Sequence, residues 1–232
     1  QLGTSSTDSG SGVTVDSSNN IYVTGSTSGE LDNNTSAGSD DIFLVKYNSS
    51  GAKQWTKQLG ATSFYVIPTD RATGITVDSS NNVYVTGNTT GDMDGITKTG
   101  GYDFFLVKYN SSGSKQWTRQ LGSATITGYH KRSWDTKAYG VTVDSSNNIY
   151  VTGNTTGGLD GNTNSNAGSG NNDIFLVKYN SSGTKQWTRQ LGTSSTDSGA
   201  GVTVDSSDNI YVTGSTLGAL DGNTNSGNSD IF

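Results

Sequence analysis

The sequence contains no cysteine, one proline and one histidine. The absence of cysteine excludes disulfides and thiolate chemistry, and a single histidine leaves no nucleophile–base pair or metal triad confined to one place. Charged residues make up 15% of the chain and hydrophobic residues 29%, both low values for a globular protein. No run of 18 or more apolar residues occurs, so no membrane-spanning helix is predicted. We therefore expect no enzymatic activity.

The net charge is −6 and the isoelectric point is near 4.6. This acidic balance argues against nucleic acid or an anionic membrane as a partner. Disordered chains combine low hydrophobicity with high net charge, whereas the polar residues of this chain are mainly Ser, Thr, Asn and Gly. The composition therefore favours a loop-rich all-β protein. Few Lys beside many Thr, Asn and Gly predict an extracellular or bacterial cell-surface location.

One stretch, GVTVDSSNNIYVTG, occurs four times with small changes, at 12–25, 74–87, 140–153 and 201–214. Apolar and polar residues alternate on both sides of a polar DSSNN turn, which predicts a β-hairpin. The aspartate that opens each turn is expected to hydrogen-bond within it; these residues are Asp16, Asp78, Asp144 and Asp205.

A second hairpin follows the first, at 41–60, 103–122 and 173–192, and its opening residues recur at 230–232. Each repeat is therefore expected to form four antiparallel strands, and 62, 66 and 61 residues separate successive copies. Tandem four-stranded units that cannot bury their faces alone are typical of a β-propeller. We predict one propeller array over 1–232, with about four blades. A parallel β-helix is the second choice, because it needs a shorter period.

The repeats resemble the bacterial SBBP β-propeller repeat over essentially the whole chain, through the pattern D-x-x-x-G-(V/I)-x-V-D followed by N-(I/V)-Y-V-T-G. The segment VKYNSSGTKQW at 177–187 also resembles the tryptophan-docking motif of quinoprotein-type propellers, although it is one residue shorter between its Asn and Gly. That resemblance implies that Trp55, Trp117 and Trp187 wedge between adjacent blades. It does not imply a quinone cofactor, and none is expected.

The chain holds four copies of the first hairpin and three complete copies of the second. We expect it to be part of a longer propeller, with a closed four-bladed ring as the alternative. Unpaired strand edges at its ends would invite assembly with another chain.

The loops that join the two hairpins of a repeat carry a D-x-N-x-N pattern. Oxygen side chains at every second position suit Ca²⁺, although the second copy has Ile96 and Lys98 where oxygens are needed. The alternative is that these residues satisfy the loop backbone through Asx turns. The candidate calcium ligands are Asp160, Asn162, Asn164, Asp173, Asp221, Asn223, Asn225 and Asp230.

The loops between repeats vary most, and two of them, Ala61–Thr73 and Ser123–Tyr139, are long. Aromatic and basic residues in such loops suit contact with a glycan, a peptide or a partner protein. Alternatively, the same side chains pack down and cap the blades. The candidate contact residues are Phe64, Tyr65, Tyr129, His130, Arg132, Trp134 and Tyr139.

These observations predict a non-enzymatic extracellular or cell-surface β-propeller that serves as a binding or structural scaffold. Its protein or glycan partner would be held where the two kinds of loop share a face. The alternative is a calcium-stabilised, carbohydrate-binding propeller. A hydrolase or lyase ranks lower, because its site would have to lie on blades outside this chain.

Overall fold

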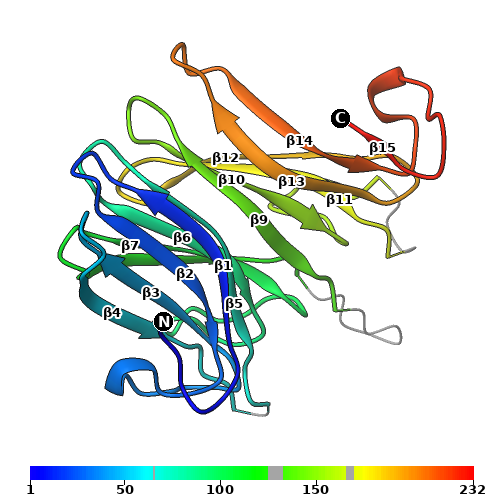
Figure 1. Cartoon of the computed structure of the whole chain (residues 1–232). Helices are drawn as coiled ribbons and strands as arrows, with labels where there is room; N and C mark the ends of the chain where they lie inside the picture. Colours follow the sequence, from blue (N-terminus) through cyan, green and yellow to red (C-terminus); the bar gives the residue numbers. More distant parts are fainter. Residues whose placement is uncertain (65, 125–132, 166–169) are drawn as a thin grey trace. The chain divides into compact units, whose positions relative to one another are not determined.

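The computed structural model describes residues 1–64, 66–124, 133–165 and 170–232 (Figure 1). Its strands form four antiparallel sheets, which we call blades: β1–β2–β3–β4, β5–β6–β7–β8, β9–β10–β11–β12 and β13–β14–β15. The predicted all-β fold with propeller-type blades is therefore confirmed. None of the helices among the described residues is long and apolar enough to cross a membrane.

The element bounds follow the two predicted hairpins closely. The first two blades consist of β1 (Asp8–Val15), β2 (Ile21–Thr27), the 3-10 turn η1 (Leu31–Asn33), β3 (Asp41–Tyr47), β4 (Lys53–Leu59), β5 (Asp70–Val77), β6 (Val83–Thr89), β7 (Asp103–Tyr109) and β8 (Lys115–Leu121). The other two consist of β9 (Thr136–Val143), β10 (Ile149–Thr155), β11 (Asp173–Tyr179), β12 (Lys185–Leu191), β13 (Asp197–Val204), β14 (Ile210–Thr216), the 3-10 turn η2 (Leu220–Gly222) and β15 (Asp230–Ile231).

The first strand of each blade begins earlier than the repeat pattern predicts. β1 starts at Asp8 instead of Gly12, and a β-bulge between Gly10 and Gly12 recurs at the matching place in the other blades. In the third blade this bulge leaves Tyr139 between the paired residues Ala138 and Gly140. Tyr139 thus belongs to a strand, so the expected loop Ser123–Tyr139 is shorter than the sequence indicates.

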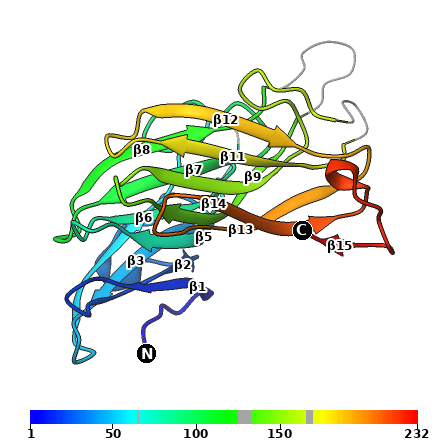
Figure 2. The same ribbon diagram turned by 90° about the horizontal axis from the view of Figure 1, so that it is seen from above.

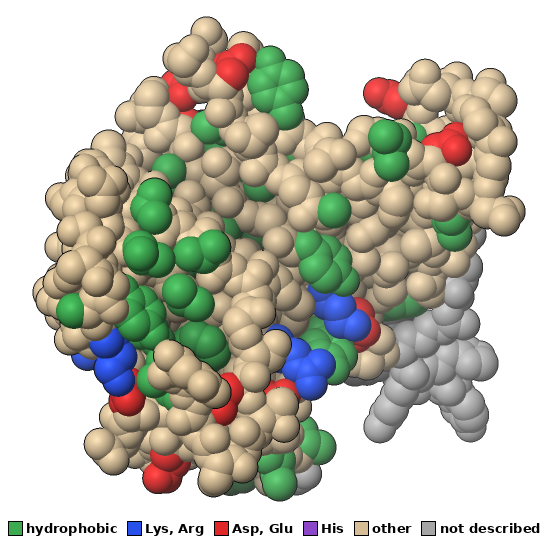
Figure 3. Space-filling view, viewed as in Figure 1, with side chains coloured by type: hydrophobic (Ala, Val, Ile, Leu, Met, Phe, Trp, Pro, Cys, Tyr) green, Lys and Arg blue, Asp and Glu red, His purple; other side chains and the backbone are tan. Residues whose placement is uncertain are grey.

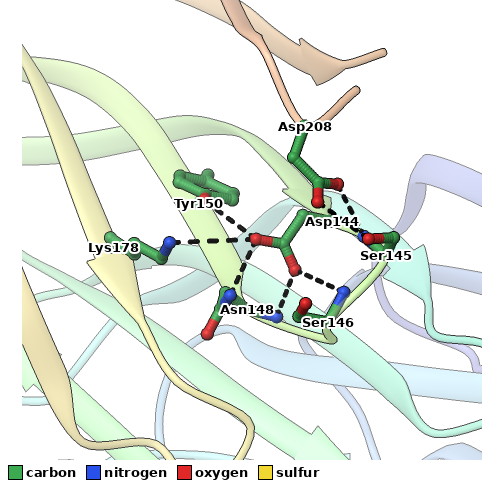
Figure 4. Close-up of polar contacts among 7 residues, drawn as sticks. All are labelled: Asp144, Ser145, Ser146, Asn148, Tyr150, Lys178 and Asp208. Atoms are coloured by element: carbon green, nitrogen blue, oxygen red, sulfur yellow. Dashed lines mark hydrogen bonds and ion pairs between the residues drawn. The ribbon is translucent and has the colours of Figure 1, made fainter. Parts of the chain in front are cut away.

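The aspartate of each hairpin turn is the centre of a hydrogen-bond network, shown for the third blade in Figure 4. Asp144 accepts the backbone N–H groups of Ser146 at 3.0 Å and Asn148 at 2.8 Å, the Asn148 amide at 2.8 Å and the Tyr150 hydroxyl at 2.9 Å. Burial opposes ionisation, but these bonds outweigh it and lower the pKa of Asp144. The expected turn role therefore accounts for this aspartate and for its equivalents Asp16, Asp78 and Asp205.

The chain divides into two compact units, Gln1–Lys98 with Phe104–Gln120, and Thr99–Asp103 with Leu121–Phe232. The first contains nearly all of the first two blades, and the second contains the other two. In the first unit, the core between the blades includes Tyr22, Ile42 and Leu44 from one sheet and Phe105, Val107 and Tyr109 from the next. Burying each such side chain contributes roughly 1.5–3 kcal/mol.

Within each unit the first strands of the two blades lie side by side, β1 with β5 and β9 with β13 (Figures 1 and 2). Glycine permits this approach in the second unit, where a Cβ on Gly140 would lie 3.1 Å from the Cα of Gly201. The hairpin turns are also linked, since Ser145 donates its backbone N–H at 3.0 Å and its hydroxyl at 2.8 Å to the Asp208 carboxylate. Each unit is thus a pair of blades packed side by side, and in the first unit the core between them is apolar.

Candidate functional site

The loops within the blades and the loops between them meet on one side of each unit, as the strand order predicts. In the first unit, the Ser39 N–H donates to the Pro68 carbonyl at 2.8 Å and the Asp70 N–H donates to the Asp40 carbonyl at 2.8 Å. In the second unit, the Asp197 N–H donates to the Asn172 carbonyl at 2.8 Å. This loop-bearing side is the candidate site.

The loop within each complete blade is held by an aspartate that reaches the fourth strand. Asp160 pairs with Lys185 and accepts the Thr188 hydroxyl at 2.8 Å. Burial alone would raise the pKa of Asp160. The bonds from Lys185 and Thr188 together have the larger effect, so the pKa of Asp160 lies below the ordinary value of an aspartate. The first two blades repeat this contact with Asp32, Lys53 and Thr56 and with Asp94, Lys115 and Thr118.

A glutamine of the fourth strand holds the same loop from its other end. Gln120 accepts the Met93 backbone N–H at 2.9 Å and donates to the Gly91 carbonyl at 3.1 Å. The other two complete blades repeat the pair of bonds through Gln58 and Gln190. Sequence reasoning missed these glutamine contacts, although a signal was present: the KQWT(K/R)Q strand follows three of the four Leu-Asp or Met-Asp loops.

The candidate calcium ligands of the third blade serve the loop that carries them. The Asn162 amide donates to the Leu159 carbonyl at 2.9 Å, and the buried Asn164 amide donates to the Thr155 carbonyl at 3.3 Å. Asp173, also buried, accepts the Ser165 backbone N–H at 2.7 Å. This arrangement favours the Asx-turn alternative.

The equivalent residues of the fourth blade behave in the same way. Asn223 donates to the Leu220 carbonyl at 3.0 Å, Asn225 accepts the Gly227 N–H at 3.1 Å, and Asp230 accepts the Ser226 N–H at 2.7 Å. Asp221 adopts a left-handed conformation, φ 56°, inside η2. Over the described ranges, no three His, Cys, Asp or Glu residues converge in a way that could hold a metal ion.

The β4–β5 loop, which departs from the repeat, exposes several apolar side chains close together. Phe64, Val66 and Ile67 are 99%, 58% and 76% exposed, respectively. The loop is fixed at both ends, since Ala61 and Pro68 are buried. Three apolar side chains are therefore exposed to solvent in a loop whose two ends are buried.

The β8–β9 loop packs its described aromatic residue inward. Trp134 is 7% exposed, and its ring lies so close to Gly157 that a Cβ there would be 2.7 Å from it. The burial of Trp134 favours the alternative that it caps the blade, while Tyr139 stands at the bulge of β9, 36% exposed. The remaining candidates, Tyr65, Tyr129, His130 and Arg132, lie outside the described residues.

Each tryptophan of a fourth strand packs against a tyrosine of its own blade. The ring centroids are 6.0 Å apart for Trp55 and Tyr22, and the pairs Trp117–Tyr84 and Trp187–Tyr150 repeat this packing. In the first unit, a Cβ on Gly113 of the second blade would lie 3.0 Å from the Trp55 ring. The docking of Trp55, Trp117 and Trp187 between adjacent blades stays a prediction.

Comparison with known proteins supports the repeat architecture. The family model of the SBBP beta-propeller repeat matches residues 1–32, 54–92, 116–160 and 186–221. An uncharacterised WD repeat-containing protein, L264 of Acanthamoeba polyphaga mimivirus, is 27% identical over 83% of this chain, and the regulatory protein FlaEY of Caulobacter vibrioides is 29% identical over 40% of it. The matches span only 16% and 10% of these relatives' own lengths.

Two solved structures are similar to this chain at low identity. A protein of unknown function from Bacteroides caccae is 9% identical with a TM-score of 0.43, covering 88% of this chain and 53% of its own. A PL25 ulvan lyase is 12% identical with a TM-score of 0.49, covering 88% of this chain and 50% of its own. Neither likeness is close enough to bear on activity.

Proposed function

Because the chain belongs to the SBBP β-propeller repeat family, we propose that it is a non-enzymatic scaffold that holds a protein partner outside the cell. The observation that carries this proposal is the exposed apolar run of the β4–β5 loop, Phe64, Val66 and Ile67. Exposed loops on a rigid framework are the usual carriers of binding, and apolar groups gathered at a surface mark a contact site.

The way in which the loop is held supports the same function. The Thr62 N–H donates to the Asp92 carbonyl at 3.1 Å, and the Thr69 N–H donates to the Thr90 hydroxyl at 2.8 Å. An anchored loop loses less conformational freedom on binding, which raises affinity. Aliphatic side chains such as Val66 and Ile67 fit an apolar pocket of a protein better than the hydroxyl-rich surface of a glycan.

The non-enzymatic character is supported by the use of the acidic residues. Asp144 accepts hydrogen bonds from the backbone of its turn, and the loop aspartates Asp32, Asp94 and Asp160 each pair with a lysine of the same blade. An extracellular location is supported by the composition, which has few Lys beside many Thr, Asn and Gly. Proteolysis of intact producing cells, compared with lysed ones, tests this location: cleavage of the chain in both samples is expected.

The binding proposal is tested with a photo-cross-linking amino acid at position 67 and, as the matched control, at the exposed position 217. Intact producing cells should yield one protein adduct from position 67 and none from position 217. Phe64→Ser should lower the affinity for the cross-linked partner about 30-fold, and the yield of the adduct should fall with it, since an aromatic anchor contributes about 2 kcal/mol to binding. The same adduct from both positions, or no loss with Phe64→Ser, would contradict the proposal.

A further inference from the structure

The β4–β5 loop is tied at its base to a buried carboxylate. Figure 3 shows hydrophobic side chains at the lower edge of the view, where this loop lies. Asp70, the first residue of β5, accepts the backbone N–H of Ala61, near the start of the loop, at 2.6 Å, and both residues are buried. The two ends of the loop also pack on the second blade, since a Cβ on Gly91 would lie 2.9 Å from the Cβ of Ala61 and 2.8 Å from that of Pro68. The protonation state of Asp70 therefore bears on how firmly the loop is held.

A second buried carboxylate, that of Asp41 at the start of β3, lies at the same loop base. A Cβ on Gly60, the neighbour of Ala61, would lie 2.0 Å from Asp41 Oδ1. In the part of the chain that the structure describes, Oδ1 of Asp41 and Oδ1 of Asp70 are both buried without a hydrogen-bond partner. Charge on a buried oxygen that accepts no hydrogen bond is costly, and like charges nearby add to that cost.

The equivalent of Asp70 in the fourth blade is better supplied with donors. Asp197 accepts both the backbone N–H of Thr193 at 2.6 Å and its hydroxyl at 3.0 Å, and the Thr216 hydroxyl donates to the other oxygen. Ala61 stands at the position of Thr193 and has no hydroxyl. The carboxylate of Asp70 therefore lacks a donor that the fourth blade provides.

The equivalent of Asp41 in the second blade is also better supplied. Asp103 accepts the Thr99 N–H on one oxygen and the Gly100 N–H on the other, each at 2.8 Å. Asp41 accepts a backbone N–H and a glutamine amide, but both bonds reach the same oxygen, Oδ2. The loop base thus holds two carboxylates and too few donors to stabilise the charge of both.

The charges around the loop base favour a neutral Asp70. Burial, followed by the charges of Asp41 and Asp40, raises the pKa of Asp70 to about 6, although the hydrogen bonds that it accepts oppose the shift. The neighbouring cation, Arg71, is largely exposed and pairs with Asp40 at 3.0 Å. Asp92, whose backbone pairs with the loop, adds a further carboxylate, which accepts a backbone N–H of its own segment.

A proton on Asp70 lowers both costs, because the carboxyl becomes neutral and gains an O–H donor. We propose that the charge of Asp70 controls how firmly the β4–β5 loop is held, a regulation of binding that rests on the function proposed above. With Asp70 protonated, the closed base presents Phe64, Val66 and Ile67 in a fixed arrangement. With Asp70 ionised, the base opens and water reaches the carboxylates, so the loop must be ordered again on binding and affinity falls.

The direct test is hydrogen exchange at the Ala61 amide, measured by NMR on the full chain and corrected for the intrinsic exchange rate. Between about pH 4 and 6, the closed base keeps the proton on Asp70, whereas an opened base loses it near the ordinary pKa of about 3.9. The protection of the Ala61 amide is therefore highest below about pH 4 and should fall about 100-fold by pH 7.

The Ser123 amide is the internal control. It occupies the equivalent place in the third blade and donates at 3.2 Å to the hydroxyl of Thr136, which does not titrate. Its protection should stay constant over the same pH range. An equal fall at both amides would mean that the whole fold loosens, and no fall at Ala61 would mean that Asp70 does not control the loop. Either result would overturn the proposal.

Two variants separate the charge of Asp70 from other effects of pH. Asp70→Asn is neutral at every pH and should keep the protection that the wild type shows at about pH 4. Asp208→Asn, which gives the fourth blade the asparagine that the other three carry in this turn, is the matched control and should keep the wild-type pH dependence. Circular dichroism establishes that both variants fold. A fall in protection that persists in Asp70→Asn would also overturn the proposal.

The link to binding is tested with the photo-cross-linking amino acid at position 67. The yield of the adduct from intact cells should be about threefold higher at pH 5 than at pH 7.5 in the wild type, and equal at both in Asp70→Asn. Equal yields in the wild type would overturn the regulation. No adduct at either pH would instead contradict the proposed function, and the exchange of the Ala61 amide would still decide whether Asp70 controls the loop.

Discussion

The loops within the first two blades and the loop between them lie on the same side of the first unit, but they use their side chains in opposite ways. The loops within the blades turn their polar groups inward, onto their own backbone and the fourth strand. The β4–β5 loop turns apolar groups outward. The repeated residues therefore maintain the fold, and an outward surface arises where the repeat is interrupted. Four experiments test this contrast.

The largest effect is expected at Asp70, where the two kinds of loop meet. Burial, together with nearby Asp41 and Asp40, raises the pKa of Asp70 to about 6, although hydrogen bonds from Ala61 and Thr89 oppose the shift. The unfolded chain ionises this group near pH 3.9. Its contribution to stability is therefore highest below about pH 4 and is lost as the pH rises through 6, by about 3 kcal/mol.

Asp70→Thr removes this dependence and has a natural precedent, because the third blade carries Thr136 at the same place, bonded to Thr155 at 3.1 Å. Between pH 4 and 7, the free energy of unfolding of the variant should gain about 3 kcal/mol relative to the wild type. Urea titrations at each pH measure the difference. A difference that does not change with pH would mean that Asp70 is not held with a raised pKa.

The second experiment removes a glutamine that holds a loop within a blade. Gln120→Ala leaves the Met93 N–H and the Gly91 carbonyl without their side-chain partner and should lower the free energy of unfolding by about 2 kcal/mol. Gln116→Ala, four residues earlier on the same strand, removes an exposed glutamine and should cost less than about 0.5 kcal/mol. Equal losses of unfolding free energy from the two variants would mean that the hydrogen bonds of Gln120 to the loop do not stabilise the fold.

The third experiment alters the outward loop. Phe64→Ser combined with Ile67→Ser should leave the free energy of unfolding within about 0.5 kcal/mol of the wild type, because both side chains are exposed. Thermal melts provide the measurement. A clear loss of stability would mean that this loop supports the fold, and the contrast with the repeated loops would disappear.

The smallest effect is expected from a chelator. Because the oxygens of Asp160 face Lys185 and Thr188, EDTA should leave the melting temperature unchanged within about 1 °C. Melts with added CaCl₂ complete the comparison. A rise in melting temperature with calcium, reversed by EDTA, would restore the calcium-stabilised alternative.

Much of the fold was predictable from local patterns. Alternation around the DSSNN turn predicted each first hairpin, because strand residues alternate between faces. The bulge was not predicted, since the residues at its centre, such as Ser11 and Tyr139, share no side-chain character. A bulge is defined by pairing with another strand, and one strand's sequence carries little trace of it.

The candidate site was predictable only in part. Phe64 and Trp134 were both aromatic residues in variable loops, and the structure exposes one and buries the other. Composition cannot distinguish them, because the difference depends on whether a neighbouring element such as Gly157 leaves room for the ring. Likewise, the sequence does not indicate that Asp160, a candidate calcium ligand, pairs with Lys185 on the fourth strand of its blade.

The sequence by itself determined the number of hairpins, their turns and the repeat of four strands, because hydrophobic alternation and turn chemistry act between near neighbours. Only the tertiary structure decided which apolar residues are covered and which are presented. Val45 and Val107 are the same residue in the same repeat and both are buried, but Val107 packs in the core between the two blades, whereas Val45 packs with Leu31 and Phe43. Whether an apolar residue is buried, and against what, depends on the element that packs on it, and only the tertiary fold determines which element that is.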